Sequence, residues 1–201
     1  MRVGVAERRP AAAVDGSDPP DAAGLVRRSA AGDLDAFAEL YHRSYPAVRR
    51  FLKAMRLDEH ALDDAAQETY LRLFRGLAKY DPVRPLIPWV LGIARLVALE
   101  AARSARAQGE AGLERGSADD PVERQVASGE ERELVQAALA ALAPEHRTVI
   151  ALRHTVGLSM KELAQALAVS APTARAHLAA AGQLLAGELR RRGVVPEGGA
   201  R

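Results

Sequence analysis

The sequence predicts an all-α protein of two small helical domains joined by a flexible linker. Three observations support this fold class. Apolar residues recur at helical spacing in two blocks, a polar stretch rich in glycine and acidic residues divides the blocks, and no segment alternates as a strand does. The predicted parts are a disordered N-terminal arm at 1–20, a first domain at 21–106, a linker at 107–129, a second domain at 130–192 and a tail at 193–201.

Composition is that of an ordinary globular protein and argues against several kinds of site. The 201 residues are 48% hydrophobic and 27% charged, which suits one domain or two small ones. The absence of cysteine excludes disulfides and thiolate metal sites, and the five histidines show no tight ligand spacing. No apolar run approaches the roughly 20 residues that a membrane-spanning helix needs. We therefore expect a cytoplasmic protein with no metal, no cofactor and no membrane insertion.

Charge is unevenly distributed along the chain, although the net charge is only +2. Residues 24–106 carry 14 Lys and Arg against 10 Asp and Glu, and residues 134–201 carry 8 against 4. The segment between them, 107–133, has 3 basic and 8 acidic residues. Two basic blocks on either side of an acidic connector suit two domains that each approach a phosphate backbone.

The N-terminal arm and the first long helix are indicated by opposite patterns. Residues 1–20 contain three prolines and no apolar periodicity, which predicts a disordered arm. Apolar residues then recur at helical spacing from Phe37 to Met55, and Asp33 stands where it would cap that helix. We expect Pro46 to bend or restart the helix. Every aromatic residue lies within Phe37 to Trp89, so the first domain should hold the larger core.

Prolines and glycines mark the end of the first domain. Three prolines between Tyr80 and Trp89 cannot continue a helix, so a stiff connection should precede a helix from about Pro88 to Arg106. The chain from Ala107 to Ser128 is polar, with three glycines and a proline, which predicts a flexible linker.

The C-terminal block has the spacing of a helix-turn-helix motif. Ser159 and Glu162 fit a capping box, in which each side chain satisfies a free amide at a helix start, and Gly157 can end the preceding helix. A tight turn then leads to a second helix, which Ser170 should cap and which carries Pro172 in its first turn. Apolar residues supply a small core without aromatic rings for three or four helices.

The stretch from Leu62 to Leu77 predicts a helix with one apolar face and one face suited to a partner. The inward stripe consists of Leu62, Ala66, Tyr70, Leu73 and Leu77. The opposite face carries Asp64, Gln67, Glu68, Leu71 and Arg75. Leu71 therefore lies among polar residues, a position that fits an ordinary solvated helix face as well as an apolar contact inside a charged interface.

Three motifs resemble those of extracytoplasmic-function sigma factors, in the RNA polymerase sigma-70 family, and they occur in the order of that family. One stretch of this chain resembles the polymerase-binding helix of the family: Asp64-Ala65-Ala66-Gln67-Glu68-Thr69-Tyr70-Leu71-Arg72-Leu73-Phe74. The promoter-melting helix is similar to Trp89-Val90-Leu91-Gly92-Ile93-Ala94-Arg95, and the helix-turn-helix runs from Ser159 to Leu185. The family consists of small bacterial transcription initiation subunits with two helical domains.

The resemblance implies a role for each domain. The first domain would be a sigma region 2-like bundle that binds core polymerase and melts the promoter, and the second a sigma region 4-like helix-turn-helix domain. The implied partners are core RNA polymerase, promoter DNA and an anti-sigma factor.

Three groups of candidate site residues follow. Polymerase binding would use Asp64, Gln67, Glu68 and Leu71, since acidic and amide groups can pair with arginines of a partner. Melting and reading of the downstream element would use Tyr80, Arg84, Trp89, Arg95, Arg103 and Arg106, which combine stacking rings with cations. Trp89 on its own fits a place in the core better than a stacking platform. The helix-turn-helix would contact DNA through Thr173, Arg175 and His177.

The sequence departs from the family pattern at three places. Leu86 stands where a phenylalanine is usual, and Leu96 stands where an asparagine is usual, so base contacts are not carried over to these two positions. The second helix of the motif continues with the alanine-rich residues 179–185 instead of basic residues. Few cations in the groove imply little counterion release on binding.

Two alternatives remain open at the level of sequence. An operator-binding regulator could use the same helix-turn-helix, although such proteins usually dimerise and no clear dimer seam is present. A sigma-like adaptor could bind polymerase without reading an upstream element. Neither these alternatives nor the leading hypothesis makes the chain an enzyme, because the sequence has no nucleophile beside a base, no paired catalytic carboxylates and no phosphate-binding glycine loop.

Overall fold

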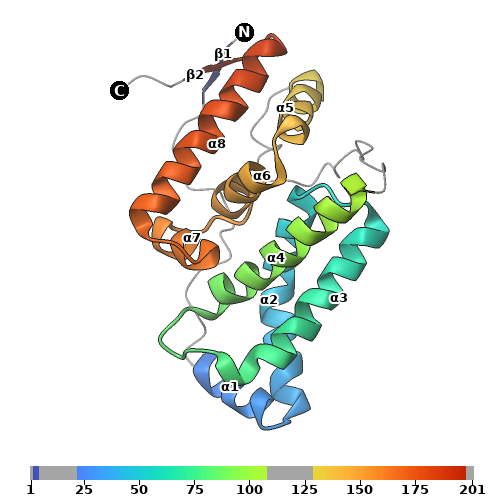
Figure 1. Cartoon of the computed structure of the whole chain (residues 1–201), viewed down its shortest axis with the longest axis vertical. Coiled ribbons are helices and arrows are strands. Elements are labelled where there is room, and N and C mark those ends of the chain that lie inside the picture. The colour runs from blue at the N-terminus through green and yellow to red at the C-terminus, as the bar shows by residue number, and fades with distance from the viewer. Residues whose placement is uncertain (1, 5–21, 108–128, 198–201) are drawn as a thin grey trace.

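The fold is all-α, as predicted, with eight α-helices in the part of the chain that the structure describes (Figure 1). This computed structural model describes residues 2–4, 22–107 and 129–197. The first half holds α1 (Ala22–Ala30), α2 (Leu34–Ala54), α3 (Glu59–Gly76), the short 3-10 helix η1 (Leu77–Lys79) and α4 (Leu86–Ala107). The second half holds α5 (Gly129–Ala141), α6 (Pro144–Ile150), the π-helical turn η3 (Ala151–Thr155), α7 (Met160–Leu167) and α8 (Ala171–Arg191).

Helix α2 begins at the predicted cap and passes through its proline. The Asp33 carboxylate accepts a hydrogen bond from the Ala36 amide at 3.0 Å and pairs with Arg28 at 2.6 Å. The hydrogen bond from the Ala36 amide, and then the one from the Arg28 guanidinium, lower the pKa of the Asp33 carboxyl. Pro46 lies inside α2, which continues to Ala54, so the proline does not restart the helix.

Helix α4 starts two residues before the predicted position. Its first residue is Leu86, and Pro88 lies in the first turn, where an absent amide leaves no hydrogen bond unmade. The predicted linker lies outside the described residues, apart from Ala107 at the end of α4 and Gly129 at the start of α5.

Two short strands were not predicted. Strand β1 (Arg2–Gly4) pairs in parallel with β2 (Val195–Glu197), in the register Val3 to Pro196. The expectation of a wholly disordered arm is therefore wrong for residues 2–4, and the rest of the arm lies outside the described residues. Strands of three residues are too short to produce a detectable alternation in the sequence.

The helix-turn-helix forms as the sequence predicts. The Ser159 hydroxyl accepts from the Glu162 amide at 3.3 Å, and the Glu162 carboxylate accepts from the Ser159 amide at 2.7 Å. Gly157 has a φ of 91°, and Ala168 closes α7 in the left-handed region with a φ of 56°. The Ser170 hydroxyl then caps α8.

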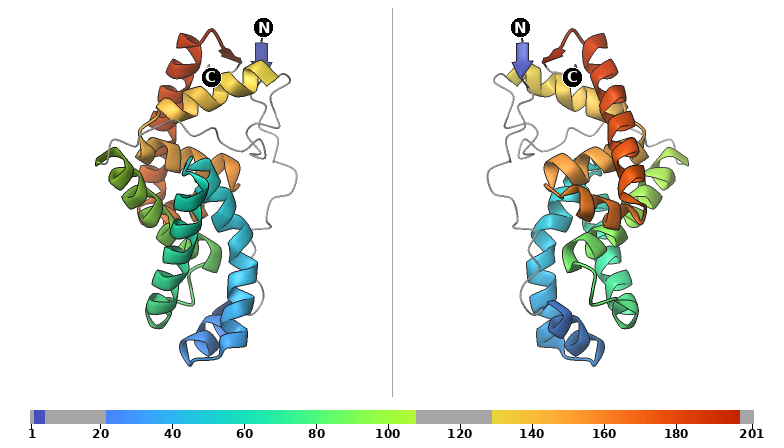
Figure 2. Two further views of the ribbon diagram at one scale, coloured as in Figure 1. Left: turned by 90° about the vertical axis from the view of Figure 1, so that its right-hand side faces the viewer. Right: turned by 90° about the vertical axis from the view of Figure 1, so that its left-hand side faces the viewer.

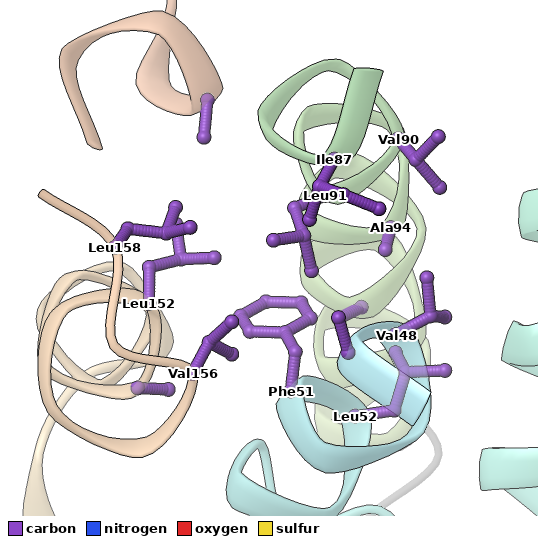
Figure 3. Packing of buried hydrophobic residues seen from close by; sticks show 14 of the residues in the cluster. Val48, Phe51, Leu52, Ile87, Val90, Leu91, Ala94, Leu152, Val156 and Leu158 are labelled. Carbon is purple, nitrogen blue, oxygen red and sulfur yellow. The ribbon is translucent and has the colours of Figure 1, made fainter. Parts of the chain in front are cut away.

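The two halves pack directly against each other through a common hydrophobic core. The buried residues form one cluster that runs from α1 through α8. Figure 3 shows Phe51 of α2 between Leu91 of α4 and the side chains of Leu152 and Val156 in the second half. In the side views of Figure 2 the helix-turn-helix half continues the long axis of the first half. The sequence suggested two separate cores, because spacing along a chain does not show which helices meet.

Replacing Ser159 with alanine is expected to lower the free energy of unfolding by about 1 kcal/mol, because one amide at the start of α7 loses its acceptor. Urea unfolding followed by circular dichroism measures the change. Lys161→Ala in the same turn is the control, since Lys161 is exposed and has no part in the capping box. Equal stabilities for the two variants would contradict the prediction.

Candidate functional site

The outer face of α3 is polar with an apolar centre. The predicted inward stripe is confirmed, because Leu62, Ala66, Tyr70, Leu73 and Leu77 are all buried. On the opposite face, Asp64 and Gln67 are exposed, and Leu71 leaves 51% of its surface accessible. An exposed leucine between polar residues can fill an apolar notch on a partner.

Phe74 extends this face beyond the residues that the sequence singled out. It is 48% exposed, and its ring meets the edge of Phe37 at 5.3 Å between centroids. At 100° per residue, Phe74 lies about 60° from Leu71 around the helix axis, so the same wheel that identified Leu71 could have identified Phe74. We define the α3 outer face as Asp64, Gln67, Leu71 and Phe74.

Glu68 is tied down by its neighbours and is only half exposed. Its carboxylate pairs with the Arg72 guanidinium at 2.7 Å. Arg72 also donates to both carboxylate oxygens of Glu100 on α4, at 2.9 and 2.7 Å. The bonds from Glu100 and Glu68 raise the pKa of Arg72, and the Arg72 guanidinium lowers the pKa of Glu100. Glu68 therefore helps to join α3 to α4.

Tyr80 and Trp89 form a pair at the start of α4. Their ring centroids lie 4.7 Å apart, and the Tyr80 hydroxyl donates to the Arg84 carbonyl oxygen. Tyr80 is buried and Trp89 is half-buried against the core. Tyr80 was expected in the group that contacts DNA, and in the structure its ring is buried, because a hydrophobic ring next to Trp89 is better buried than solvated.

The cations of the predicted DNA-binding group are spread along α4. Arg84 is exposed before the helix and lies 3.6 Å from the Asp81 carboxylate. Arg103 and Arg106 are exposed at the far end, about 30 Å away along the helix. Arg95 lies between them and is half-buried, and its Nε atom has no hydrogen-bond partner among the described residues. Burial lowers the pKa of Arg95.

Helix α8, the second helix of the helix-turn-helix, exposes all three predicted residues. Arg175 and His177 point away from the core, and Thr173 is exposed at the first turn. The Thr173 hydroxyl lies 2.7 Å from the Ser170 hydroxyl, so it takes part in the cap of α8. At the other end of α8, Arg191 and Arg192 both pair with Glu188, which lowers the pKa of the Glu188 carboxyl.

Within the described ranges no three side chains of the ligand types gather as a metal site would require. None of the described helices is both long and apolar enough to cross a bilayer.

Two family models match the chain, one in each half. Sigma-70 region 2 matches residues 40–108, and Sigma-70 region 4 matches residues 132–183. These ranges contain α3 and α4 in the first half and the helix-turn-helix in the second.

Curated relatives and solved structures agree with these matches. The RNA polymerase sigma factor CarQ of Myxococcus xanthus is 30% identical over 150 residues, which cover 72% of this chain and 83% of CarQ. The ECF RNA polymerase sigma factor SigK of Mycobacterium tuberculosis is 29% identical over 160 residues, which cover 77% of this chain and 86% of SigK.

The fold is that of CnrH, solved in complex with the cytosolic domain of CnrY. The TM-score is 0.63 at 24% identity, over 83% of this chain and 96% of the CnrH chain. The sigma factor RpoE of Bartonella quintana, solved with the anti-sigma factor NepR, has a TM-score of 0.55 at 18% identity, over 77% and 96% of the two chains. The chain belongs to the extracytoplasmic-function sigma factors of the sigma-70 family, the factors that direct RNA polymerase to initiate transcription at promoters.

Proposed function

We propose that the α3 outer face is the surface through which this sigma factor binds core RNA polymerase. The observation that carries the proposal is the pair of large apolar side chains, Leu71 and Phe74, which are about half exposed beside Asp64 and Gln67. Interfaces of this kind place an apolar anchor at the centre and pair the surrounding charges with those of the partner. Asp64 and Gln67 would supply the polar contacts.

Glu68 has a different part in this interface. Its carboxylate already accepts from Arg72, which is held by Glu100 in turn. A contact between Glu68 and a partner arginine would have to share this carboxylate with Arg72. Glu68 would therefore act mainly by fixing α3 against α4, and Asp64 is the cleaner position for a test.

Promoter melting would use the outer surface of α4 and the loop before it. Arg84, Arg103 and Arg106 are exposed and would follow the phosphates of the displaced strand, and the half-buried Trp89 would offer the accessible part of its ring to an unpaired base. Tyr80 would hold the Trp89 ring in position through their ring contact instead of stacking on a base itself. Arg95 would join this group once its Nε atom becomes accessible.

The upstream promoter element would be contacted by the start of α8. Arg175 and His177 would reach base edges or phosphates, and Thr173 would hold the first turn of the helix in place. With one arginine in this contact, the affinity of the second half for DNA should depend only weakly on salt.

The remaining parts of the proposal concern partners and setting. CnrH and RpoE were each solved with a second protein, CnrY in one case and the anti-sigma factor NepR in the other. We infer that an anti-sigma factor also binds this chain. We infer further that this sigma factor works in the cytoplasm and that the catalysis of transcription belongs to the polymerase.

Replacing Asp64 with arginine is expected to weaken binding to core RNA polymerase by about tenfold or more, because the change removes one attraction and creates a repulsion. Titration of labelled sigma factor with core polymerase at moderate salt measures the affinity. Asp63→Arg is the matched control, since it has the same charge change at an exposed site about 100° around α3. If the two variants bind alike, the α3 outer face is not the interface.

A further inference from the structure

One large apolar side chain is exposed in the middle of α4, the helix proposed to melt the promoter. Leu96 leaves 47% of its surface accessible, whereas Leu86, at the start of the same helix, is fully buried. The sequence departs from the family pattern at both positions. Burial in the core accounts for an apolar residue at Leu86, but much of the Leu96 side chain faces solvent.

Leu96 lies in line with two residues of the proposed DNA contact. At 100° per residue, positions 89, 96 and 103 fall within about 40° of one another around the helix axis. Trp89 is half-buried and Arg103 is exposed, and each lies about 10 Å from Leu96 along the axis. We define the α4 line as Trp89, Leu96 and Arg103. It offers an aromatic ring, an apolar side chain and a cation in succession.

The charges around the α4 line favour a strand of nucleic acid over a protein partner. Arg84 is exposed before the helix, and Arg106 is exposed beyond Arg103. The exposed leucine of α3 has a different setting, because Leu71 shares its helix face with the carboxylate of Asp64. Cations beyond both ends of the α4 line suit a single strand of DNA whose phosphates run along the helix.

One carboxylate lies beside the α4 line, and the protein itself neutralises it. Glu100 follows Leu96 by one turn, and an unpaired negative charge there would repel a DNA strand. Arg72 of α3 donates to both oxygens of the Glu100 carboxylate, at 2.9 and 2.7 Å. These bonds, and then the charge of Arg103, lower the pKa of Glu100. The carboxylate therefore remains paired at neutral pH, and the line stays open to a polyanion.

A leucine can recognise only an apolar part of a base. It has no donor or acceptor, so it cannot pair with the polar edge of an unpaired base as an asparagine could. Among the four DNA bases only thymine carries an apolar group on its edge, the C5 methyl group. The amino group of cytosine lies next to the same ring position, and it would lose a hydrogen bond to water against a leucine. An unpaired thymine is therefore the base that this position favours.

We propose that Leu96 selects thymine in the displaced promoter strand by contact with its C5 methyl group, while Trp89 and Arg103 hold the strand on either side. This inference rests on the proposed function of α4 in promoter melting. It assigns a base preference to a position where the side chain offers no hydrogen bond.

Removal of the methyl group from the DNA tests the contact directly. Single-stranded dodecamers of thymidine and of deoxyuridine differ only by that methyl group, and a homopolymer presents the same base in every register. The complex of the full chain with core polymerase should bind the thymidine strand about fourfold more tightly, as expected for the burial of one methyl group. Fluorescence anisotropy of labelled strands at moderate salt measures both affinities, and core polymerase alone gives the background.

Substitutions at Leu96 should change this preference specifically. In Leu96→Ala the two strands should bind with equal affinity, whereas Leu96→Met should keep most of the preference, because its side chain remains apolar. Leu184→Ala is the matched control, since Leu184 lies in helix α8 and is also 47% exposed. A folding defect would lower both affinities alike and leave their ratio unchanged.

The possible results separate this inference from the function on which it rests. Equal affinities for the two strands in the parent chain, or an unchanged preference in Leu96→Ala, would overturn the role of Leu96. If Leu96→Ala instead weakens binding to core polymerase and keeps the preference, Leu96 contacts protein and the proposal is wrong.

Arg103→Ala tests the path of the strand, because loss of this cation should weaken binding of both strands about threefold or more and leave their ratio at about four. An unchanged affinity in Arg103→Ala would remove α4 from the path of the strand, and with it the proposed function of α4. Weakened binding in Arg103→Ala, together with equal affinities of the parent for the two strands, would remove only the role of Leu96.

Discussion

Replacing Phe51 with alanine is expected to lower the free energy of unfolding by about 4 kcal/mol, because the ring is fully buried where the two halves meet. The ring lies between α4 and the side chains of Leu152 and Val156, so its removal would open a cavity in the core of both halves. Domains of this size are stable by only about 5–15 kcal/mol, so the loss is a large part of the total.

Two probes show whether both halves lose stability together. Trp89 is the single tryptophan, and its fluorescence reports on the first half. Amide hydrogen exchange in α7 reports on the second half. In Phe51→Ala, the unfolding transitions reported by both probes should move to lower urea concentrations. If only the Trp89 signal moves, the halves do not share a core in solution.

Phe37→Ala is the matched control for this experiment. Phe37 lies in the same helix, but its ring is half-buried and meets the edge of Phe74 on the outside of the first half. Phe37→Ala should therefore lower the free energy of unfolding by less than Phe51→Ala does, and it should leave hydrogen exchange in α7 unchanged. The comparison separates the loss of a phenylalanine from the loss of the contact between the halves.

Local features of the fold could be predicted because their physical causes are local. The capping box at Ser159 and Glu162 and the caps at Asp33 and Ser170 each depend on residues three positions apart. The buried stripe of α3 follows from the helical period alone. The motifs of the resembled family gave the order of these elements along the chain.

Long-range features could not be predicted from the same patterns. The burial of Tyr80 depends on Trp89, nine residues away and on another element, and the half-burial of Arg95 accompanies close packing between α4 and a helix about 70 residues further along the chain. Periodicity identifies which side of a helix is apolar, but it does not identify the helix that covers it. For this reason the shared core appeared only in the structure.

The candidate site on α3 was predictable for the opposite reason. Asp64, Gln67 and Leu71 are exposed, so no distant element determines their position once the helix and its buried stripe are known. Glu68 was the exception, because its ion pair with Arg72 connects through Glu100 to α4. A substitution at Glu68 would thus disturb the packing of α3 on α4 as well as any interface.

Arg147→Met is expected to lower the free energy of unfolding by about 3 kcal/mol, although it removes a partly buried charge. The guanidinium donates to the carbonyl oxygens of Leu139, Ala140 and Leu142 at the end of α5, at 3.0, 2.8 and 2.9 Å. Its fourth bond goes to the Met55 carbonyl oxygen at the end of α2, at 3.1 Å. Methionine fills similar space but leaves these four carbonyl groups without this donor.

Two helix C-termini hold the Arg147 guanidinium through their carbonyl oxygens, and no carboxylate of the described residues pairs with it. The ends of α2 and α5 each present carbonyl oxygens with a partial negative charge, and the guanidinium lies where the two ends converge. Burial, and then repulsion from Arg56 and Arg106, lowers the pKa of Arg147 to about 10. The group therefore remains protonated at neutral pH, and its positive charge is balanced by helix ends from both halves.

Three variants separate the geometry of this group from its charge. Arg147→Lys keeps the charge, but a single ammonium group cannot reach all four carbonyl groups. Its free energy of unfolding, measured with urea, should therefore fall nearly as far as that of Arg147→Met. Arg153→Met is the control, because the Arg153 guanidinium donates to a single carbonyl oxygen of the described residues, that of Leu158 at 2.9 Å. Its free energy of unfolding should fall by about 1 kcal/mol. If Arg147→Lys is as stable as the parent, the charge alone holds the two helix ends together. If Arg147→Met is as stable as the parent, the cost of burying the guanidinium equals the gain from its four bonds, and Arg147 contributes nothing to holding the halves together.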